Sequence, residues 1–371
     1  MTRLHAELEA RGDILNLAHG YPDGLDPPWL ADLPRSLAAA GWRDLAVEPD
    51  LATLRRHFAA QFDGEAATLT NSASEALLLA FDAALDAVGG GEILTLDGTY
   101  DAYDGLARMC RGRLRRIPRE APTDRPDVAR LAAHVGPRTR ALLLTQPENP
   151  LGWSYPQAEI DAAAALARRH DLALILDCAF ASLAPGGRVP LPASTADLRL
   201  LVIGDTGKLL ALHGVRLGAV VHAARLADHL HAAVSDLHFR LDTPRVTVLA
   251  RAVADPRLEL HRHDLVARVA ANHRILSAAT APHVRCPRPE ATSMALVSIP
   301  GSPLADAEFT AALLAEERVA LVPLALFYAD SPRQALPGAC SARVALARPE
   351  DCVAAAAERL ARFARRRAVA C

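Results

Sequence analysis

The middle of the chain alternates between short apolar runs and longer stretches in which apolar residues recur every three or four positions. The stretches 128–135 and 156–170 predict helices, and the apolar runs predict strands at 92–96, 140–145, 172–176 and 200–203. Strands that are apolar on both faces are typical of a parallel sheet covered by helices on each side. The pattern therefore predicts an α/β fold with a mostly parallel sheet between helices.

The segments that flank this core have a different pattern. On the N-terminal side we expect helices over 1–13, 50–62 and 76–88, with a turn-rich arm over 19–28. On the C-terminal side we expect helices over 258–278, 306–317 and 350–366 and strands over 293–299, 320–323 and 342–346. This mixture predicts a smaller α+β unit. We therefore expect a large domain over 36–260 and a small domain built from 1–35 and 261–371.

Composition and charge exclude several classes of partner. Apolar residues make up 51% of the 371 residues and charged residues 23%, as in soluble globular proteins. A formal net charge of −2 predicts no attraction to nucleic acid or to an anionic membrane, and we expect neither as a partner. The arginine clusters at 111–116 and 362–367 are interpreted as solvated faces. Six cysteines without CxxC pairs and a polar N-terminus predict a reduced, cytoplasmic protein.

One basic residue differs in kind from the others. Lys208 is the only lysine of the chain, so all other residues among the 41 counted as lysine or arginine are arginines. Arginine replaces lysine wherever a solvated positive charge is enough, but its guanidinium does not lose a proton to become a nucleophile. A lysine that persists after an apolar strand and a glycine-containing turn is therefore a candidate Schiff-base residue.

Polar residues follow the predicted strands at the points where the strands end. Tyr100, Asn149, Asp177 and Lys208 each lie just past such an end. In open parallel sheets the ligand binds at the carboxyl ends of the strands. We therefore expect these four side chains to lie around one ligand site.

The order and spacing of these pieces resemble the fold-type-I pyridoxal 5′-phosphate (PLP) enzymes, specifically the class I/II aminotransferase superfamily. The resemblance covers nearly the whole chain and implies that the large domain binds PLP. It implies that Lys208 forms a Schiff base with PLP and then moves the α-proton of the substrate. It also implies that Asp177 pairs with the pyridine nitrogen and that Asn149 hydrogen-bonds the phenolic oxygen of PLP. Taken alone, Asp177 could be a strand-end cap and Asn149 part of a turn.

The resemblance assigns a phosphate site to two further segments. Ser72, Ala73 and Ser74 precede a helix, where free N–H groups suit a phosphate, although the same residues make an ordinary helix N-cap. Arg216 follows Lys208 by eight residues, where the family places a phosphate-binding arginine. Tyr100 matches the aromatic residue that stacks on the PLP ring; core packing is the alternative.

Substrate contacts are expected from the small domain. Arg343 resembles the arginine that binds the substrate α-carboxylate with both ends of its guanidinium, although a surface strand arginine is an alternative. The arm that contains His19 and Gly20 resembles the segment that closes over the substrate. Asn149 is expected beside this substrate site as well.

Two positions depart from the family pattern. Phe180 replaces a tyrosine whose phenol contacts the cofactor, and Asp205 replaces a serine that contacts the phosphate. A carboxylate beside a phosphate is unfavourable unless it is redirected or paired. The segment 205–208 also resembles PLP enzymes that process arginine in pathways to enduracididine-type and capreomycidine-type antibiotics. Possible partners for a guanidinium are Asp23, Asp101, Asp104 and Glu148.

The histidines of the chain do not form a metal-ligand pattern, and we expect no metal site. They are interpreted as helix-surface residues: His229, His231, His238, His261 and His263. The predicted function is a homodimeric, PLP-dependent aminotransferase that moves an amino group between an L-amino acid and a 2-oxo acid in specialised, antibiotic-type biosynthesis. An oxidase, hydroxylase or cyclase acting on arginine is the alternative reaction. A PLP-fold binding protein without turnover is the alternative outside the enzymes.

Overall fold

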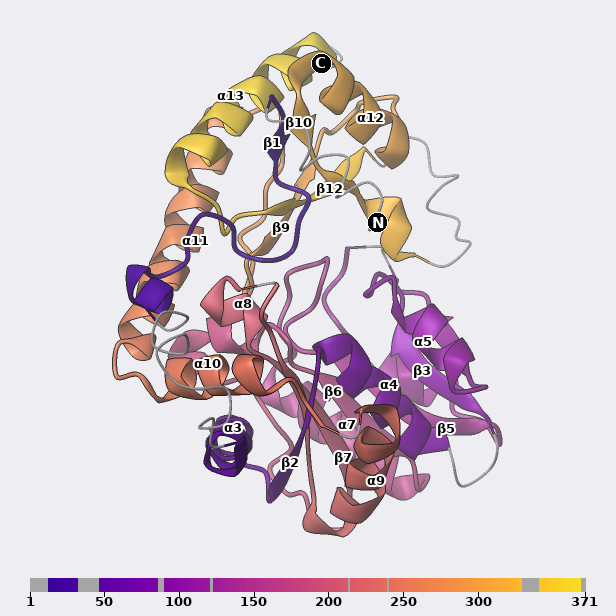
Figure 1. Ribbon diagram of the computed structural model, residues 1–371. Helices are drawn as coiled ribbons and strands as arrows, with labels where there is room; N and C mark the ends of the chain where they lie inside the picture. The colour runs from indigo at the N-terminus through magenta and orange to yellow at the C-terminus, as the bar shows by residue number, and fades with distance from the viewer. Residues whose placement is uncertain are drawn as a thin grey trace.

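The computed structural model describes residues 13–32, 47–85, 90–120, 123–212, 214–238, 240–328 and 340–367. Figure 1 shows the middle of the chain forming a body of sheet and helices, with the C-terminal elements above it. The N-terminal arm with β1 (Leu15–Asn16) lies among these C-terminal elements, so the two ends of the chain build one unit. The helix expected over 1–13 falls outside the described residues except for Asp13.

The central sheet has seven strands in the order β2-β8-β7-β6-β5-β3-β4. Only β8 runs antiparallel to its neighbours, and all other pairs are parallel. This sheet confirms the expected fold class. The strands are β2 (Ala66–Thr70), β3 (Glu92–Leu96), β4 (Arg113–Ile117), β5 (Thr139–Thr145), β6 (Ala173–Asp177), β7 (Arg199–Asp205) and β8 (Gly218–His222).

The sheet is buried on both faces because successive side chains of a strand point in opposite directions. In β5, Leu142 and Leu144 join one core cluster, whereas Ala141 and Leu143 join the other. Helices α4 (Ala73–Leu85), α5 (Tyr103–Met109) and α9 (Ala227–His238) supply the second cluster. Helices on the opposite face are α3 (Val47–Gln61), α6 (Val128–Ala132), α7 (Gln157–Arg169) and α10 (Thr243–Ala254).

The second unit is built around a three-stranded antiparallel sheet, in the order β11 (Val322–Pro323), β12 (Ser341–Ala345) and β9 (Met294–Ser298). Its helices are α11 (Leu258–Thr280), α12 (Asp306–Glu317) and α13 (Glu350–Arg367). Strand β1 pairs in parallel with β10 (Val319–Ala320), which brings the N-terminal arm to this unit. Short 3₁₀ turns lie at Pro28–Ala31, Ala181–Leu183, Pro185–Gly187, Ala224–Leu226 and Leu324–Phe327.

Several elements differ from the sequence-based expectation. Strands β2, β4 and β8 and helices α5, α9 and α10 were not expected from the pattern of apolar residues. The interpretation of 111–116 as a solvated face is wrong for Arg116, whose side chain is 5% exposed and pairs with Asp104. Arg116 lies on β4, the edge strand of the sheet, and the carboxylate of Asp104 compensates its charge there.

The histidine interpretation is also wrong for His261, whereas His238 stays partly exposed at the end of α9. His261 is buried, and its Nε2 lies 2.8 Å from the carbonyl oxygen of Leu209. His238 contacts the carboxylate of Glu75 and, at 2.9 Å, the amide of Asn71. In the described part of the chain no three histidine, cysteine or acidic side chains come together as metal ligands. None of the helices that the structure describes is both long and apolar enough to span a bilayer.

Candidate active site

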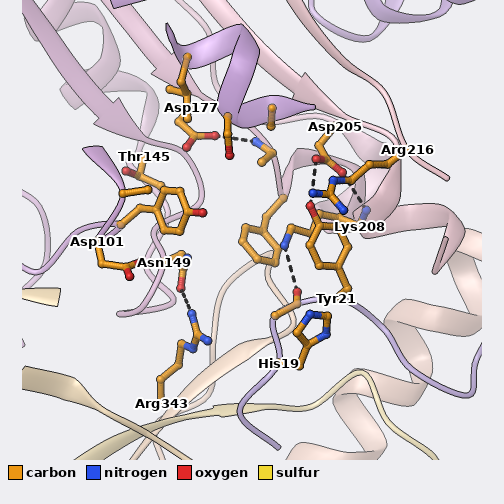
Figure 2. Close-up of a pocket in the computed structure, with 18 of the residues that line it drawn as sticks. His19, Tyr21, Asp101, Thr145, Asn149, Asp177, Asp205, Lys208, Arg216 and Arg343 are labelled. Atoms are coloured by element: carbon orange, nitrogen blue, oxygen red, sulfur yellow. Dashed lines mark hydrogen bonds between the residues drawn. The ribbon is translucent and has the colours of Figure 1, made fainter. Parts of the chain in front are cut away.

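A cavity of about 620 Å³ opens at the carboxyl ends of the central strands, where the two units meet. It is lined by every site residue predicted from the sequence except Ser72. Figure 2 shows Lys208, Asp177, Arg216 and Arg343 converging on it from different elements. The strand ends and the small unit thus meet at one hollow, at the edge of the sheet where the sequence predicts the ligand site.

Lys208 lies in α8 (Gly207–Leu210), the short helix that follows β7. Its Nζ donates a hydrogen bond of 3.1 Å to the carbonyl oxygen of Gly20. The ammonium lies 3.6 Å from the ring centroid of Tyr21 and 4.6 Å from that of Phe180. Burial lowers the pKa of Lys208 to about 8, against the opposing charge of Asp205. At pH 7 about a tenth of this amine is therefore unprotonated, far more than for a lysine with its ordinary pKa, and the unprotonated form is the nucleophile.

Asp177 ends β6, and its two oxygens have different partners. The hydroxyl of Tyr103 donates to Oδ2 at 2.6 Å, and the backbone N–H of Ala179 donates to Oδ1 at 3.1 Å. Thr145 lies 2.9 Å from the same hydroxyl, so Tyr103 is held from both sides. Burial raises the pKa of Asp177 above its ordinary value. A cationic N–H placed in the cavity against this carboxylate would favour its ionised form.

The turn between β2 and α4 lines a further part of the cavity. Position 218 has to be glycine because a Cβ there would lie 2.4 Å from the carbonyl carbon of Ser72. The Ser72 hydroxyl accepts a hydrogen bond from the backbone N–H of Glu75 at 3.2 Å. Ser72 thus caps α4 outside the cavity, and Ala73 and Ser74 face the cavity together with Arg216. A guanidinium beside a helix N-terminus suits an anion.

Asp205 ends β7 and is turned towards its own chain. Its Oδ1 accepts hydrogen bonds from the backbone N–H groups of Gly207 at 2.6 Å and Lys208 at 3.1 Å. Its Oδ2 accepts one from the Tyr21 hydroxyl at 3.4 Å. The carboxylate thereby caps α8, which is the redirection that a carboxylate at this position requires.

Arg343 projects from β12 into the cavity with only 4% of its surface exposed, so a surface strand arginine is excluded. Its Nη1 donates to Oδ1 of Asn149 at 2.9 Å and its Nη2 to the carbonyl oxygen of Ala18 at 2.7 Å. Its Nε is buried without a hydrogen-bond partner among the described residues. Burial lowers the pKa of Arg343 to about 10, which still leaves it charged at neutral pH. Figure 2 shows the guanidinium across the cavity from Asp177.

Residues 13–360 match the sequence model of the family described as aminotransferase class I and II. The chain belongs to this family. Methionine aminotransferase of Escherichia coli is 27% identical over 95% of this chain and 93% of its own. A solved structure of the E. coli protein YbdL, with a methionine aminotransferase function, superposes with a TM-score of 0.82 at 25% identity, covering 97% and 96% of the two chains. Arginine–pyruvate transaminase AruH of Pseudomonas aeruginosa is 30% identical over 62% of this chain and 60% of its own.

Class I and II aminotransferases use PLP, and the cavity of this aminotransferase fits that cofactor. The amine of Lys208 suits the aldehyde of PLP. The buried carboxylate of Asp177 suits its pyridine nitrogen, and Arg216 beside the N-terminus of α4 suits its phosphate. The donor and acceptor set of the cavity therefore matches each polar end of PLP.

The structure sorts the acidic residues considered for a guanidinium. Asp104 pairs with Arg116, and Glu148 pairs with Arg119 within the protein interior. Asp101 lines the cavity, and Asp23 does not.

Two polar cavity residues, Tyr21 and Thr145, were missed in the sequence. The ring of Tyr21 covers the amine of Lys208. Tyr21 was not singled out, although the preceding residue, Gly20, was. Thr145 lines the cavity without belonging to a recognised motif, whereas Asp101 was named from the sequence as a possible partner for a guanidinium. The sequence offered one signal for Tyr21. Because Phe180 replaces the usual cofactor-contacting tyrosine, a tyrosine from another segment could have been sought for the site.

Proposed function

We propose that this aminotransferase works through Lys208, Asp177 and Arg343. The observation that carries the proposal is the partly buried amine of the only lysine, in one cavity with a buried carboxylate and a buried guanidinium. These groups match the three charged centres of the reaction: the amine to be exchanged, the ring nitrogen of the cofactor and the α-carboxylate of the substrate.

PLP, when bound, supplies an aldehyde that combines with amines and a ring that withdraws electrons from the bond to be broken. Lys208 would hold the cofactor through its amine, and the same amine would act as the base that accepts and returns the α-proton of the substrate. Asp177, supported by Tyr103, keeps a cationic ring nitrogen protonated.

The remaining contacts orient the reactants. Arg216, Ser74 and the N-terminus of α4 would hold the phosphate, with Ala73 beside them, and Tyr100 would pack against the ring, since all of them line the cavity. Asn149 accepts a hydrogen bond from Arg343, and from the same cavity it would contact the phenolic oxygen of the cofactor. Arg343 binds the α-carboxylate, for which its unpaired Nε is a further donor. His19 and Gly20 form the mouth on the substrate side.

We propose that the substrate belongs to specialised, antibiotic-type amino-acid biosynthesis, in a pathway that handles arginine or a cyclised relative such as enduracididine. The resemblance of residues 205–208 supports this, together with the similarity to an arginine–pyruvate transaminase. An oxygen-dependent or cyclising reaction on arginine is the second candidate, because Phe180 and Asp205 depart from the usual aminotransferase pattern. The division into 36–260 and 1–35 with 261–371, the homodimer and the cytoplasmic location stay predictions.

The test is the absorption spectrum of the PLP-loaded protein before and after L-arginine, L-methionine or L-glutamate, with and without oxygen. Transamination is expected to bleach the visible band without oxygen, and a 2-oxo acid is expected to restore it. Oxygen uptake that accompanies turnover of arginine would support the second candidate instead. Lys208→Ala should abolish turnover, and Lys208→Arg is the matched control that keeps the charge but lacks the nucleophile. Wild-type turnover by either variant would contradict the assignment of Lys208.

A further inference from the structure

The N-terminal arm crosses from the small unit to the lysine of the large one. Strand β1 pairs with β10, and beyond it the carbonyl oxygen of Leu17 accepts a hydrogen bond of 2.8 Å from the N–H of Ala345. Further along, the N–H of Asp23 donates to the carbonyl oxygen of Ala347 at 3.2 Å. The arm is therefore fastened to the segment between β12 and α13 on both sides of Gly20.

Arg348 fixes the arm between these two points. Its side chain is almost fully buried, with 1% of its surface exposed. The guanidinium donates to the carbonyl oxygens of Asn16 at 2.9 Å, His19 at 2.7 Å and Tyr21 at 2.7 Å. A buried guanidinium is stable only if its N–H groups are satisfied, and here backbone carbonyls of the arm provide most of its acceptors. Displacing the arm would leave the charge of Arg348 unsatisfied, so the arm has one strongly preferred position.

The tip of the arm lies on Lys208. The carbonyl oxygen of Gly20 accepts the hydrogen bond from Nζ at 3.1 Å, and the ring of Tyr21 covers the same atom at 3.6 Å. The Tyr21 hydroxyl reaches Asp205 at the end of β7. A Cβ at position 207 would lie 2.7 Å from Cε1 of Tyr21, so the ring fits because Gly207 has no side chain. Ring and turn are therefore matched in shape.

We propose that Tyr21 is a positioning residue of the active site: carried on the arm that Arg348 anchors, it covers one side of the amine of Lys208, shields that side from water and holds the amine against Gly20. This role of Tyr21 rests on the proposed function, because it concerns the same Lys208. It would set the position and the protonation of the Lys208 amine. Lys208 is partly buried beneath Tyr21 of the arm and Phe180, which follows β6, and this desolvation is the largest cause of its lowered pKa. The charges around it are Asp205 and Asp177, which raise its pKa, and Arg343 and Arg216, which lower it.

The only lysine of the chain allows a direct measurement. Full-length cofactor-free protein labelled with ¹³C,¹⁵N-lysine gives one lysine side-chain signal, whose shift with pH reports the pKa of Lys208. The wild type is expected to titrate near 8. Tyr21→Leu admits water and should raise the pKa by about one unit, a tenfold change in proton affinity. Tyr21→Phe keeps the ring and should change the pKa by a few tenths at most.

Trp29→Leu is the matched control, since it removes an aromatic ring from the same N-terminal segment. Trp29 packs against Arg257 at 5.0 Å and does not line the cavity. Its replacement should leave the pKa of Lys208 unchanged. If Tyr21→Leu only destabilised the fold, the pKa of Lys208 would stay unchanged in that variant, as in Trp29→Leu.

Arg348→Met tests the anchor independently of the ring. It removes every hydrogen bond from the guanidinium to the arm and should speed amide exchange over 17–23 while raising the pKa of Lys208. An unchanged or lower pKa in folded Tyr21→Leu would overturn the proposal, as would an unchanged pKa in Arg348→Met. The titration uses no cofactor, so failure of the protein to bind PLP would contradict the proposed function and leave this result standing.

Discussion

Asp177 and Asp205 are the same residue at corresponding places, and the structure uses them differently. Each is the last residue of a central strand, each is buried, and burial raises the pKa of each. Asp177 receives one side-chain hydrogen bond and one backbone hydrogen bond and faces the cavity. One carboxylate oxygen of Asp205 accepts hydrogen bonds from two backbone N–H groups of α8, and the other accepts one from the Tyr21 hydroxyl.

The difference arises in the residues that follow each strand. Helix α8 begins at Gly207, two residues after Asp205, and presents N–H groups that no helical carbonyl can accept. After Asp177 the chain makes a looser turn, and its first 3₁₀ turn begins at Ala181. A strand-end carboxylate therefore becomes a cap or a cavity ligand according to how soon a helix starts behind it.

The strongest test of this comparison is Asp177→Asn. The variant keeps the shape of the side chain but loses the charge that would hold a ring nitrogen protonated, so kcat should fall on the order of 10²–10³-fold, the range seen when a preorganised polar partner is removed. Steady-state kinetics with the best donor measures the effect. Asp205→Asn should lower kcat much less. Equal losses of kcat in the two variants would show that the two carboxylates do not differ in role.

The pH dependence of PLP capture by the cofactor-free protein distinguishes the two carboxylates further. Capture needs the unprotonated amine of Lys208, whose pKa is lowered to about 8. Below that pH the rate should therefore fall about tenfold per unit as the amine becomes protonated, and above it the rate should level off. Both carboxylates raise this pKa, Asp205 more than Asp177, so neutralising Asp205 should move the midpoint further down. Stopped-flow absorbance across pH 6–10 measures it.

Asp205→Ser is expected to have a smaller effect than Asp177→Asn, and this effect is a gain: the variant should bind the cofactor more tightly. Serine caps a helix about as well as aspartate, so the stability of the cofactor-free protein should change by less than about 1 kcal/mol. Removing a negative charge from the end of the cavity beside Arg216 should strengthen PLP binding several-fold. Equilibrium titration with PLP measures the change, and weaker binding would mean that Asp205 itself supports the cofactor.

How much of the fold was predictable depended on burial. Strands β5, β6 and β7 have apolar residues on both faces, and their sequences alone indicated them. Strand β4 contains Arg113, Arg115 and Arg116 at the sheet edge, where charged side chains reach solvent or find partners such as Asp104. Its pairing with β3 is a tertiary contact that no local pattern records.

The candidate site divides in the same way. Lys208 and Asp177 were accessible from the sequence because a unique lysine and a strand-end carboxylate stand in a recognisable order. Tyr103 was not, because it lies inside the apolar face of α5 and its role depends on β5 and β6 lying beside each other. Ser72 was placed in the cavity, whereas the structure uses its hydroxyl to cap α4. A motif locates a turn, but only the packing shows which of its side chains faces the ligand.

The smallest expected effect is that of Tyr103→Phe, which alters Asp177 without removing it. The variant loses the 2.6 Å hydrogen bond to Oδ2, while the bond from the Ala179 N–H to Oδ1 remains. Tyr103 lowers the pKa of Asp177 against the effect of burial, so its loss should raise that pKa and weaken the hold on a cationic ring nitrogen. A hydrogen bond contributes about 1 kcal/mol, which corresponds to a fall of roughly fivefold in kcat.

Tyr155→Phe is the control for this last prediction, because Tyr155 is equally buried but bonds to Glu148 on the other side of β5. It should leave kcat unchanged while costing similar stability, as thermal unfolding would show. If Tyr103→Phe behaved like Tyr155→Phe, Asp177 would be held well enough by its backbone contact alone. The two strand-end aspartates would then differ only in the direction they face, and Tyr103 would have a packing role.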